Sequence, residues 1–73
     1  MTDSEIRELL VEKESIEYQL KNLNYIISEN KHPKRLDNFK ENRKIHETRL
    51  AEINTILDEL VSQGKDLDKI RGI

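Results

Sequence analysis

The sequence predicts an all-α fold, an antiparallel two-helix hairpin of the coiled-coil type. Apolar residues recur at alternating spacings of three and four in two long segments, and the only proline lies between these segments. Charged residues make up 38% of the chain and hydrophobic residues 34%. The alternating spacing defines a coiled-coil seam, and a proline interrupts a continuous helix. We therefore expect one hairpin domain over residues 1–64 and a short C-terminal tail over residues 65–73.

The first helix is predicted over about residues 4–30. Thr2 and Glu5 have the spacing of a capping box, with Asp3 and Ser4 as competing caps. The apolar seam of this helix is interrupted once, by Lys13. The seam positions are Ile6, Leu9, Lys13, Ile16, Leu20, Leu23 and Ile27. A single polar seam residue is typical of a device that fixes register, or of a lysine whose charged end reaches solvent.

A reversal of the chain is predicted at about residues 30–34. Asn30 suits the C-cap of the first helix, and Pro33 suits the first turn of a new helix, where its missing N–H is not needed. The alternative is one kinked helix of about twice the length. That helix would expose both apolar seams unless partners covered them, so the hairpin is favoured.

The second helix is predicted over about residues 34–62, with Gly64 as the C-cap. Its seam has two polar breaks, at Arg43 and His46. The seam positions are Leu36, Phe39, Arg43, His46, Leu50, Ile53, Leu57 and Leu60. Beyond Gly64, three apolar residues allow a short docked turn, but the pattern favours a frayed tail over residues 65–73.

The two seams match each other in one antiparallel register, in which the numbers of facing residues add up to 66. This register sets apolar residues opposite one another, as in Leu9 with Leu57. Each polar break meets an aliphatic residue, so that Arg43 faces Leu23 and Lys13 faces Ile53. A slip of a few residues would spoil this match, so the register supports the hairpin.

Further apolar residues predict a partner-binding surface. Some flank the seam, and others recur every seven residues on the opposite face of the first helix. The predicted interface residues are Val11, Tyr18, Leu10, Ile26, Ile56 and Val61. A two-helix hairpin cannot cover so wide an apolar stripe. Dimerisation into a four-helix bundle, or docking into a groove of a larger protein, would cover it.

Charge is unevenly distributed along the chain. Residues 21–49 hold eight basic and four acidic side chains, whereas the remaining residues hold five basic and eleven acidic ones. The turn-proximal half is therefore positive, which suits contact with nucleic-acid phosphates. The predicted nucleic-acid-binding residues are Lys31, His32, Lys34, Arg35, Lys40, Arg43, Lys44 and Tyr25. The alternative is that these charges only solvate helix faces.

The composition argues against an enzyme, a cofactor and a metal site. The chain has no cysteine, no glycine-rich phosphate loop and no cluster of ligands around its two histidines. Carboxylates on exposed helix faces make poor general acids. No stretch is apolar enough to cross a membrane, and the acidic N-terminus is unlike a signal peptide. We therefore expect a non-enzymatic, cytoplasmic protein.

The hairpin plan of about residues 4–62 and the basic turn Lys31-His32-Pro33-Lys34-Arg35 resemble known small proteins. In plan, the chain resembles the small helical hairpins that accompany or terminate phage recombination and repair helicases. It is also similar to dimeric RNA-binding hairpin proteins of plasmids. The resemblance implies single-stranded nucleic acid or a helicase as partner. We expect an accessory module that binds single-stranded DNA without sequence preference, with a protein adaptor or homodimerisation module as the alternative.

Overall fold

The computed structural model of the chain describes residues 1–29 and 33–72, and these residues form helices but no strand. The two long helices are α1 (Asp3–Glu29) and α2 (Leu36–Ser62). A 3₁₀ turn, η1 (Pro33–Arg35), precedes α2, and a short helix, α3 (Leu67–Arg71), follows it. The predicted all-α class is therefore confirmed. Within the described residues, no helix combines the length and the apolar character that a membrane span requires.

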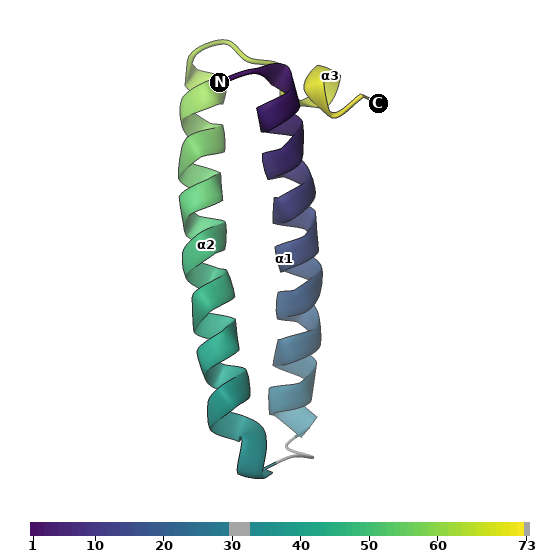
Figure 1. Cartoon of the computed structure of the whole chain (residues 1–73), viewed down its shortest axis with the longest axis vertical. Coiled ribbons are helices and arrows are strands. Elements are labelled where there is room, and N and C mark those ends of the chain that lie inside the picture. The colour runs from purple at the N-terminus through teal and green to yellow at the C-terminus, as the bar shows by residue number, and fades with distance from the viewer. Residues whose placement is uncertain (30–32, 73) are drawn as a thin grey trace.

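Helices α1 and α2 lie side by side, with the start of α1 beside the end of α2 (Figure 1). The molecule measures 46 × 21 × 15 Å. We call the pole where α1 begins the open end and the opposite pole the turn end. The predicted register sets Arg43 opposite Leu23; in the structure Arg43 Nη1 donates a hydrogen bond to Oδ1 of the next residue, Asn24, at 3.3 Å.

Local interactions fix the start of α1. The Thr2 backbone N–H and hydroxyl donate hydrogen bonds to Glu5 Oε1 at 3.1 and 3.0 Å, and the Glu5 N–H donates one to Thr2 Oγ1 at 3.3 Å. These are the reciprocal bonds of a capping box. Thr2, and not Asp3 or Ser4, is therefore the cap of α1, as its spacing from Glu5 predicts.

The ends of α2 also follow from local sequence. Pro33 begins η1, so the regular α-helix starts at Leu36, about two residues later than predicted. At the other end, the Gly64 N–H donates to the Val61 carbonyl and the Lys65 N–H to the Leu60 carbonyl, both at 3.0 Å. This pattern needs a left-handed residue, and Gly64 supplies it with φ of +89°. The predicted cap at Asn30 and the turn up to residue 32 lie outside the described residues.

The hydrophobic core is concentrated toward the open end. Its buried members are Ile6, Leu10, Ile16, Ile53, Leu57, Leu60 and Ile70. Five of them are predicted seam residues, whereas Leu10 and Ile70 are not. Near the turn end, seam residues such as Ile27 and Phe39 are only half-buried. Two helices alone cover less apolar surface than the three elements that meet at the open end.

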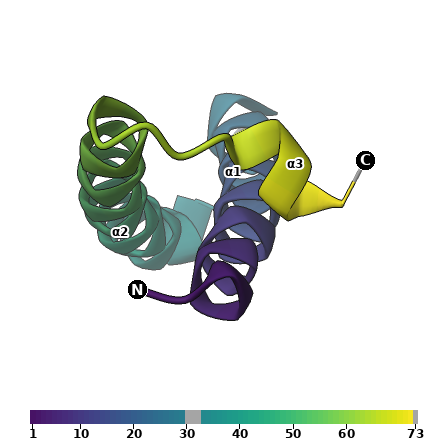
Figure 2. The same ribbon diagram turned by 90° about the horizontal axis from the view of Figure 1, so that it is seen from above.

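The C-terminal residues correct the predicted frayed tail. Residues 67–71 form α3, which lies beside α1 at the open end (Figure 2). Ile70 is 8% exposed and belongs to the core, and its carbonyl accepts a hydrogen bond from Arg7 Nε at 3.1 Å. Asp66 caps α3 by accepting from the Lys69 N–H at 3.3 Å. Docking against α1 supplies the burial that a five-residue helix lacks by itself.

Candidate interaction surfaces

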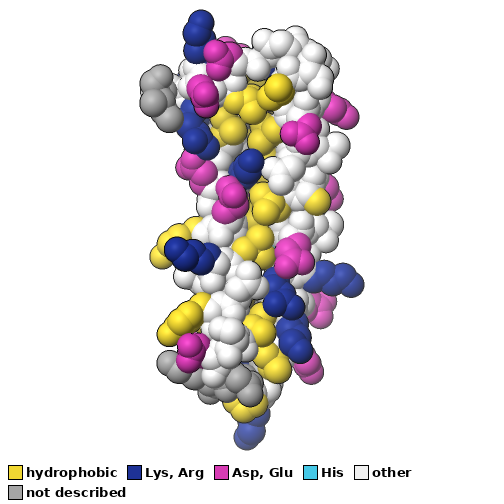
Figure 3. Space-filling model, turned by 180° about the vertical axis from the view of Figure 1, so that it is seen from behind, with side chains coloured by type: hydrophobic (Ala, Val, Ile, Leu, Met, Phe, Trp, Pro, Cys, Tyr) yellow, Lys and Arg dark blue, Asp and Glu magenta, His cyan; other side chains and the backbone are white. Residues whose placement is uncertain are grey.

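The cations predicted to bind nucleic acid lie on the turn-proximal part of α2 and on η1. We call this set the basic surface; its described members are Lys34, Arg35, Lys40, Arg43 and Lys44. All of them are exposed except Arg43, which is half-buried. Seen from behind, Lys and Arg side chains gather over this part of α2 (Figure 3). Lys31 and His32, also predicted to bind nucleic acid, lie outside the described residues.

Most of the basic surface is not neutralised by nearby acids. Over residues 1–29 and 33–72, no carboxylate lies within 4.0 Å of the charged groups of Lys34, Arg35, Lys40 or Lys44. Arg43 alone has such a neighbour, with Nε 3.8 Å from Oε1 of Glu47. These cations therefore project a positive field that is not cancelled locally.

The ion pairs that join different elements lie away from the turn end. Lys65 Nζ is 3.8 Å from Asp3 Oδ1, and Arg71 Nη2 is 2.6 Å from Glu14 Oε1. Both pairs tie the C-terminal residues to α1. The excess of acids around the open end is therefore partly neutralised by the residues that follow α2.

The aromatic residues of the turn-proximal half differ in exposure. Tyr25 is 60% exposed, so its ring is accessible to stack on a base, as predicted. Phe39 is half-buried, which fits its predicted place in the seam. Only Tyr25 therefore joins the basic surface as a candidate contact.

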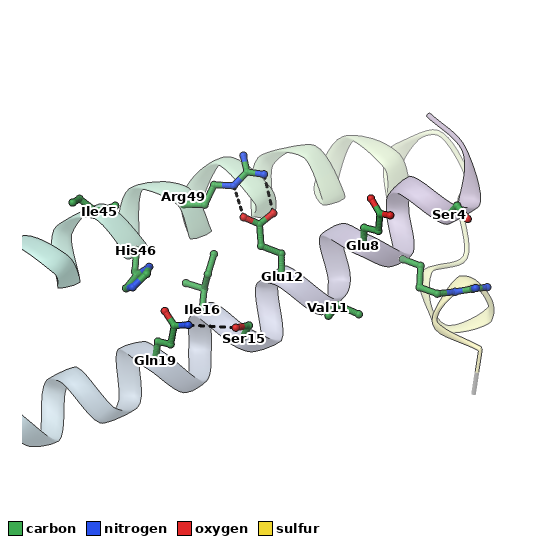
Figure 4. A pocket seen from close by; sticks show the side chains of 11 residues that line it. Ser4, Glu8, Val11, Glu12, Ser15, Ile16, Gln19, Ile45, His46 and Arg49 are labelled. Carbon is green, nitrogen blue, oxygen red and sulfur yellow. Dashed lines mark hydrogen bonds and ion pairs between the residues drawn. The ribbon is translucent and has the colours of Figure 1, made fainter.

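A groove extends along α1 from Ser4 to Gln19 and meets α2 near its middle, at Ile45, His46 and Arg49 (Figure 4). Its volume is about 770 Å³. Val11, Ile16 and Ile45 provide its apolar lining, and the half-buried His46 lies at one end. A smaller groove of about 220 Å³ continues toward the turn end and shares Gln19 and His46 with the first. Together they form one depression, which we call the groove face.

A bidentate ion pair crosses this groove and joins the two long helices. Arg49 Nε and Nη2 donate hydrogen bonds to the two carboxylate oxygens of Glu12 at 2.8 and 2.9 Å. Arg49 Nη1 also reaches Glu52 at 3.3 Å. The hydrogen bonds from Arg49 hold the pKa of the Glu12 carboxyl below its usual value, although desolvation partly opposes them. The hydrogen bonds with Glu12 and Glu52 raise the pKa of the Arg49 guanidinium above its ordinary value.

The lowered pKa of Glu12 predicts an acid-sensitive contribution to stability. Since the unfolded chain takes up the Glu12 proton at a higher pH than the folded chain, this contribution is complete above the unfolded pKa. It is lost as the pH falls through the folded pKa. We expect Glu12→Gln to unfold at a lower urea concentration than the parent chain at pH 7. The difference between the two urea concentrations should shrink toward pH 3. Urea unfolding of both chains at several pH values measures this difference in stability. A difference that grows on acidification would contradict the prediction.

The residues predicted as a partner interface divide into two groups. Val11, Tyr18 and Val61 are 61, 67 and 54% exposed, and Ile26 lines the smaller groove. Leu10, by contrast, is only 6% exposed. It lies on the same helical stripe as Arg7 and Glu14, which both contact α3, so α3 covers it. Ile56 is half-buried and packs against the core. Leu10 is therefore an internal contact of this chain, which corrects its predicted role, whereas the half-buried Ile56 stays a predicted interface residue.

Two features of the groove face are absent from the sequence prediction. Ile45 is 57% exposed although it neighbours a seam residue, and the pair Glu12–Arg49 links the helices. Opposite charges at positions that flank a coiled-coil seam often pair across it. Glu12 is next to the seam residue Lys13 and Arg49 is next to the seam residue Leu50, so the signal for this ion pair was available in the sequence.

The described residues contain no group of three or more side chains able to hold a metal ion. Comparison with known proteins does not assign a family either. No family model, curated protein or solved structure matches this chain. Its function must therefore be inferred from the basic surface and the groove face.

Proposed function

We propose that this chain is a non-enzymatic accessory module that binds single-stranded nucleic acid without sequence preference. In this proposal the chain is an antiparallel helical hairpin in solution, and the basic surface contacts phosphates. The observation that carries it is the set of four exposed cations at one end, Lys34, Arg35, Lys40 and Lys44, with no carboxylate within ion-pair distance among the described residues. Single-stranded DNA is the expected ligand.

The placement of these cations suits a flexible, charged strand. Lys40, Arg43 and Lys44 occupy positions i, i+3 and i+4 of α2, so they lie on one face of the helix. Lys34 and Arg35 continue the positive charge to the end of the molecule. A strand that follows this face would pass from one cation to the next, and the exposed ring of Tyr25 would offer a platform for one base.

Titration of a fluorescent single-stranded DNA at two salt concentrations tests this proposal. Neutralising about four phosphates predicts a log–log salt slope near −2.8, hence a roughly 50-fold weaker affinity at 200 mM than at 50 mM salt. Reversing Lys34→Glu together with Arg35→Glu is expected to weaken binding by at least about 10-fold. Acidic residues near the start of α2 interact favourably with the positive end of the helix dipole, so the fold should persist.

A matched control separates the basic surface from the net charge. The double variant Lys65→Glu with Lys69→Glu changes the net charge by the same amount, but it acts at the open end. We expect it to retain most of the affinity. Absence of binding by the parent chain at 50 mM salt, or equal losses in both variants, would refute the proposal.

A second candidate function is that of a protein adaptor or homodimerisation module. The observation that favours it is the groove face, where Val11 and Ile45 remain more than half exposed. Apolar side chains in a groove between helices are typical docking sites for another helix. This function needs no contact with nucleic acid.

A further inference from the structure

We propose that a second copy of this chain binds the groove face in the opposite orientation, around a two-fold axis that lies in the interface and crosses α1 near its middle. The proposal deepens the second candidate function by naming the partner and its orientation. It does not depend on nucleic-acid binding.

The single chain exposes more surface than a compact protein of its mass, because its shape is elongated. Its accessible surface is 5630 Å². A compact chain of 8.7 kDa is expected to expose about 4,700 Å². The excess of roughly 900 Å² is close to the area of about 800 Å² that each partner buries in a standard interface. One partner of similar size would therefore bring this chain to the exposure of an ordinary small protein.

The groove face is long enough and central enough to be that interface. Its two grooves are joined through Gln19 and His46, and their apolar lining includes Val11, Ile16 and Ile45 in one and Leu23 and Ile26 in the other. The middle residues of the two long helices are Ile16 and Arg49. Ile16 also lies near the centre of the groove lining on α1, which extends from Ser4 to Ile26, so a two-fold axis that crosses α1 here sets this lining against the same lining of the second copy.

The distribution of charge selects the antiparallel orientation. Glu5 and Glu8 lie together on the open-end half of this side of α1, beside Glu12, whose charge Arg49 neutralises, and near Arg7 of the larger groove. The turn-proximal half of the groove face is lined by uncharged residues, including Asn22 and Asn42. Parallel copies would place their acid-rich open ends against each other, whereas antiparallel copies place each acidic end beside a neutral or basic half. Avoiding such like-charge contact favours the antiparallel pair.

The surface opposite to the proposed interface stays free in this arrangement. Lys40 and Arg43 do not line either groove, and Arg43 reaches Asn24 across the helix pair instead. The dimer would therefore carry one basic surface near each of its two ends. Self-association and nucleic-acid binding are then separable by mutation.

Sedimentation equilibrium over about 1 μM to 1 mM protein tests self-association. The parent chain is expected to form dimers within this range. Ile45→Glu places a charge in the groove of both subunits and is expected to raise the dissociation constant by about 10-fold or more. Ala51→Glu is the control, because Ala51 is an exposed aliphatic residue of α2 that lines neither groove. It is expected to dimerise like the parent chain.

Nitroxide labels at single introduced cysteines test the orientation, since the chain has no cysteine of its own. Ser15 lies near the proposed axis, and Glu8 is seven residues farther from it on the same groove. In an antiparallel dimer, labels at Glu8→Cys are displaced by about 21 Å more along the helix axis than labels at Ser15→Cys. In a parallel dimer the two separations would be similar.

The outcomes distinguish this proposal from the nucleic-acid proposal. A parent chain that stays monomeric throughout, equal weakening by Ile45→Glu and Ala51→Glu, or similar label separations at both positions would each overturn the antiparallel dimer. DNA titration of Ile45→Glu should match that of the parent chain. If dimerisation fails while DNA binding remains, only the dimer is refuted; if DNA binding is absent while dimers form, only the nucleic-acid function is refuted.

Discussion

Replacing Ile53 with alanine is expected to lower the free energy of unfolding by about 2–5 kcal/mol. Ile53 is 0% exposed and packs in the core cluster with Ile6, which is also fully buried. Truncation removes three buried carbon atoms and leaves a cavity between α1 and α2. Because a core of this size supplies only roughly 3–5 kcal/mol, the variant is expected to be largely unfolded at 25 °C.

Urea unfolding followed by circular dichroism measures this effect. Ile45→Ala is the matched control, since it makes the same chemical change on the same helix at a residue that is 57% exposed. We expect this control to change stability by about 0.5 kcal/mol or less when both variants are measured at concentrations where the chain is monomeric. Similar losses in the two variants would show that Ile53 is not a core residue.

Ile70→Ala is expected to release α3 from α1. The side chain of Ile70 is 8% exposed in the core, and its loss removes about 2–5 kcal/mol from the docking of a five-residue helix that is unstable by itself. The hydrogen bond from Arg7 to the Ile70 carbonyl and the ion pair Arg71–Glu14 would be lost with it. Undocking would also expose Leu10, so α3 decides whether Leu10 is available to a partner.

Amide hydrogen exchange of α3 is the measurement for this variant. The Ile70 N–H donates to the Asp66 carbonyl at 3.2 Å, and in the variant it should exchange nearly as fast as in an unstructured peptide. Asp68→Ala changes an exposed residue of the same helix and should keep its protection. Protection that survives Ile70→Ala would mean that α3 does not depend on this contact.

Local rules in the sequence predicted the ends of the helices well. The capping box of Thr2 and Glu5 and the left-handed Gly64 are interactions within a few residues, so the spacing of residue types suffices to predict them. The first turn after Pro33 is a 3₁₀ turn, which residue spacing does not distinguish from an α-helical one.

The sequence predicted the candidate surfaces only in part. Tyr25 is exposed and Arg43 is half-buried, whereas Leu10 is covered by α3 and Ile56 is half-buried against the core. The three apolar residues beyond Gly64 gave a weak signal, because so few apolar residues in a short segment are compatible with either a free or a docked tail. Docking of α3 depends on residues of α1 at the open end, such as Arg7 and Glu14. These residues lie more than fifty positions before α3 in the sequence.

The sequence by itself determined the two helices, their seams and the uneven distribution of charge along the chain, because these depend on the order and spacing of neighbouring residues. The tertiary structure decided which apolar residues are covered, which cations lack an acidic neighbour among the described residues, and where the groove lies. These properties depend on how α1, α2 and α3 approach one another. The burial of Leu10 therefore becomes visible only once the elements are packed.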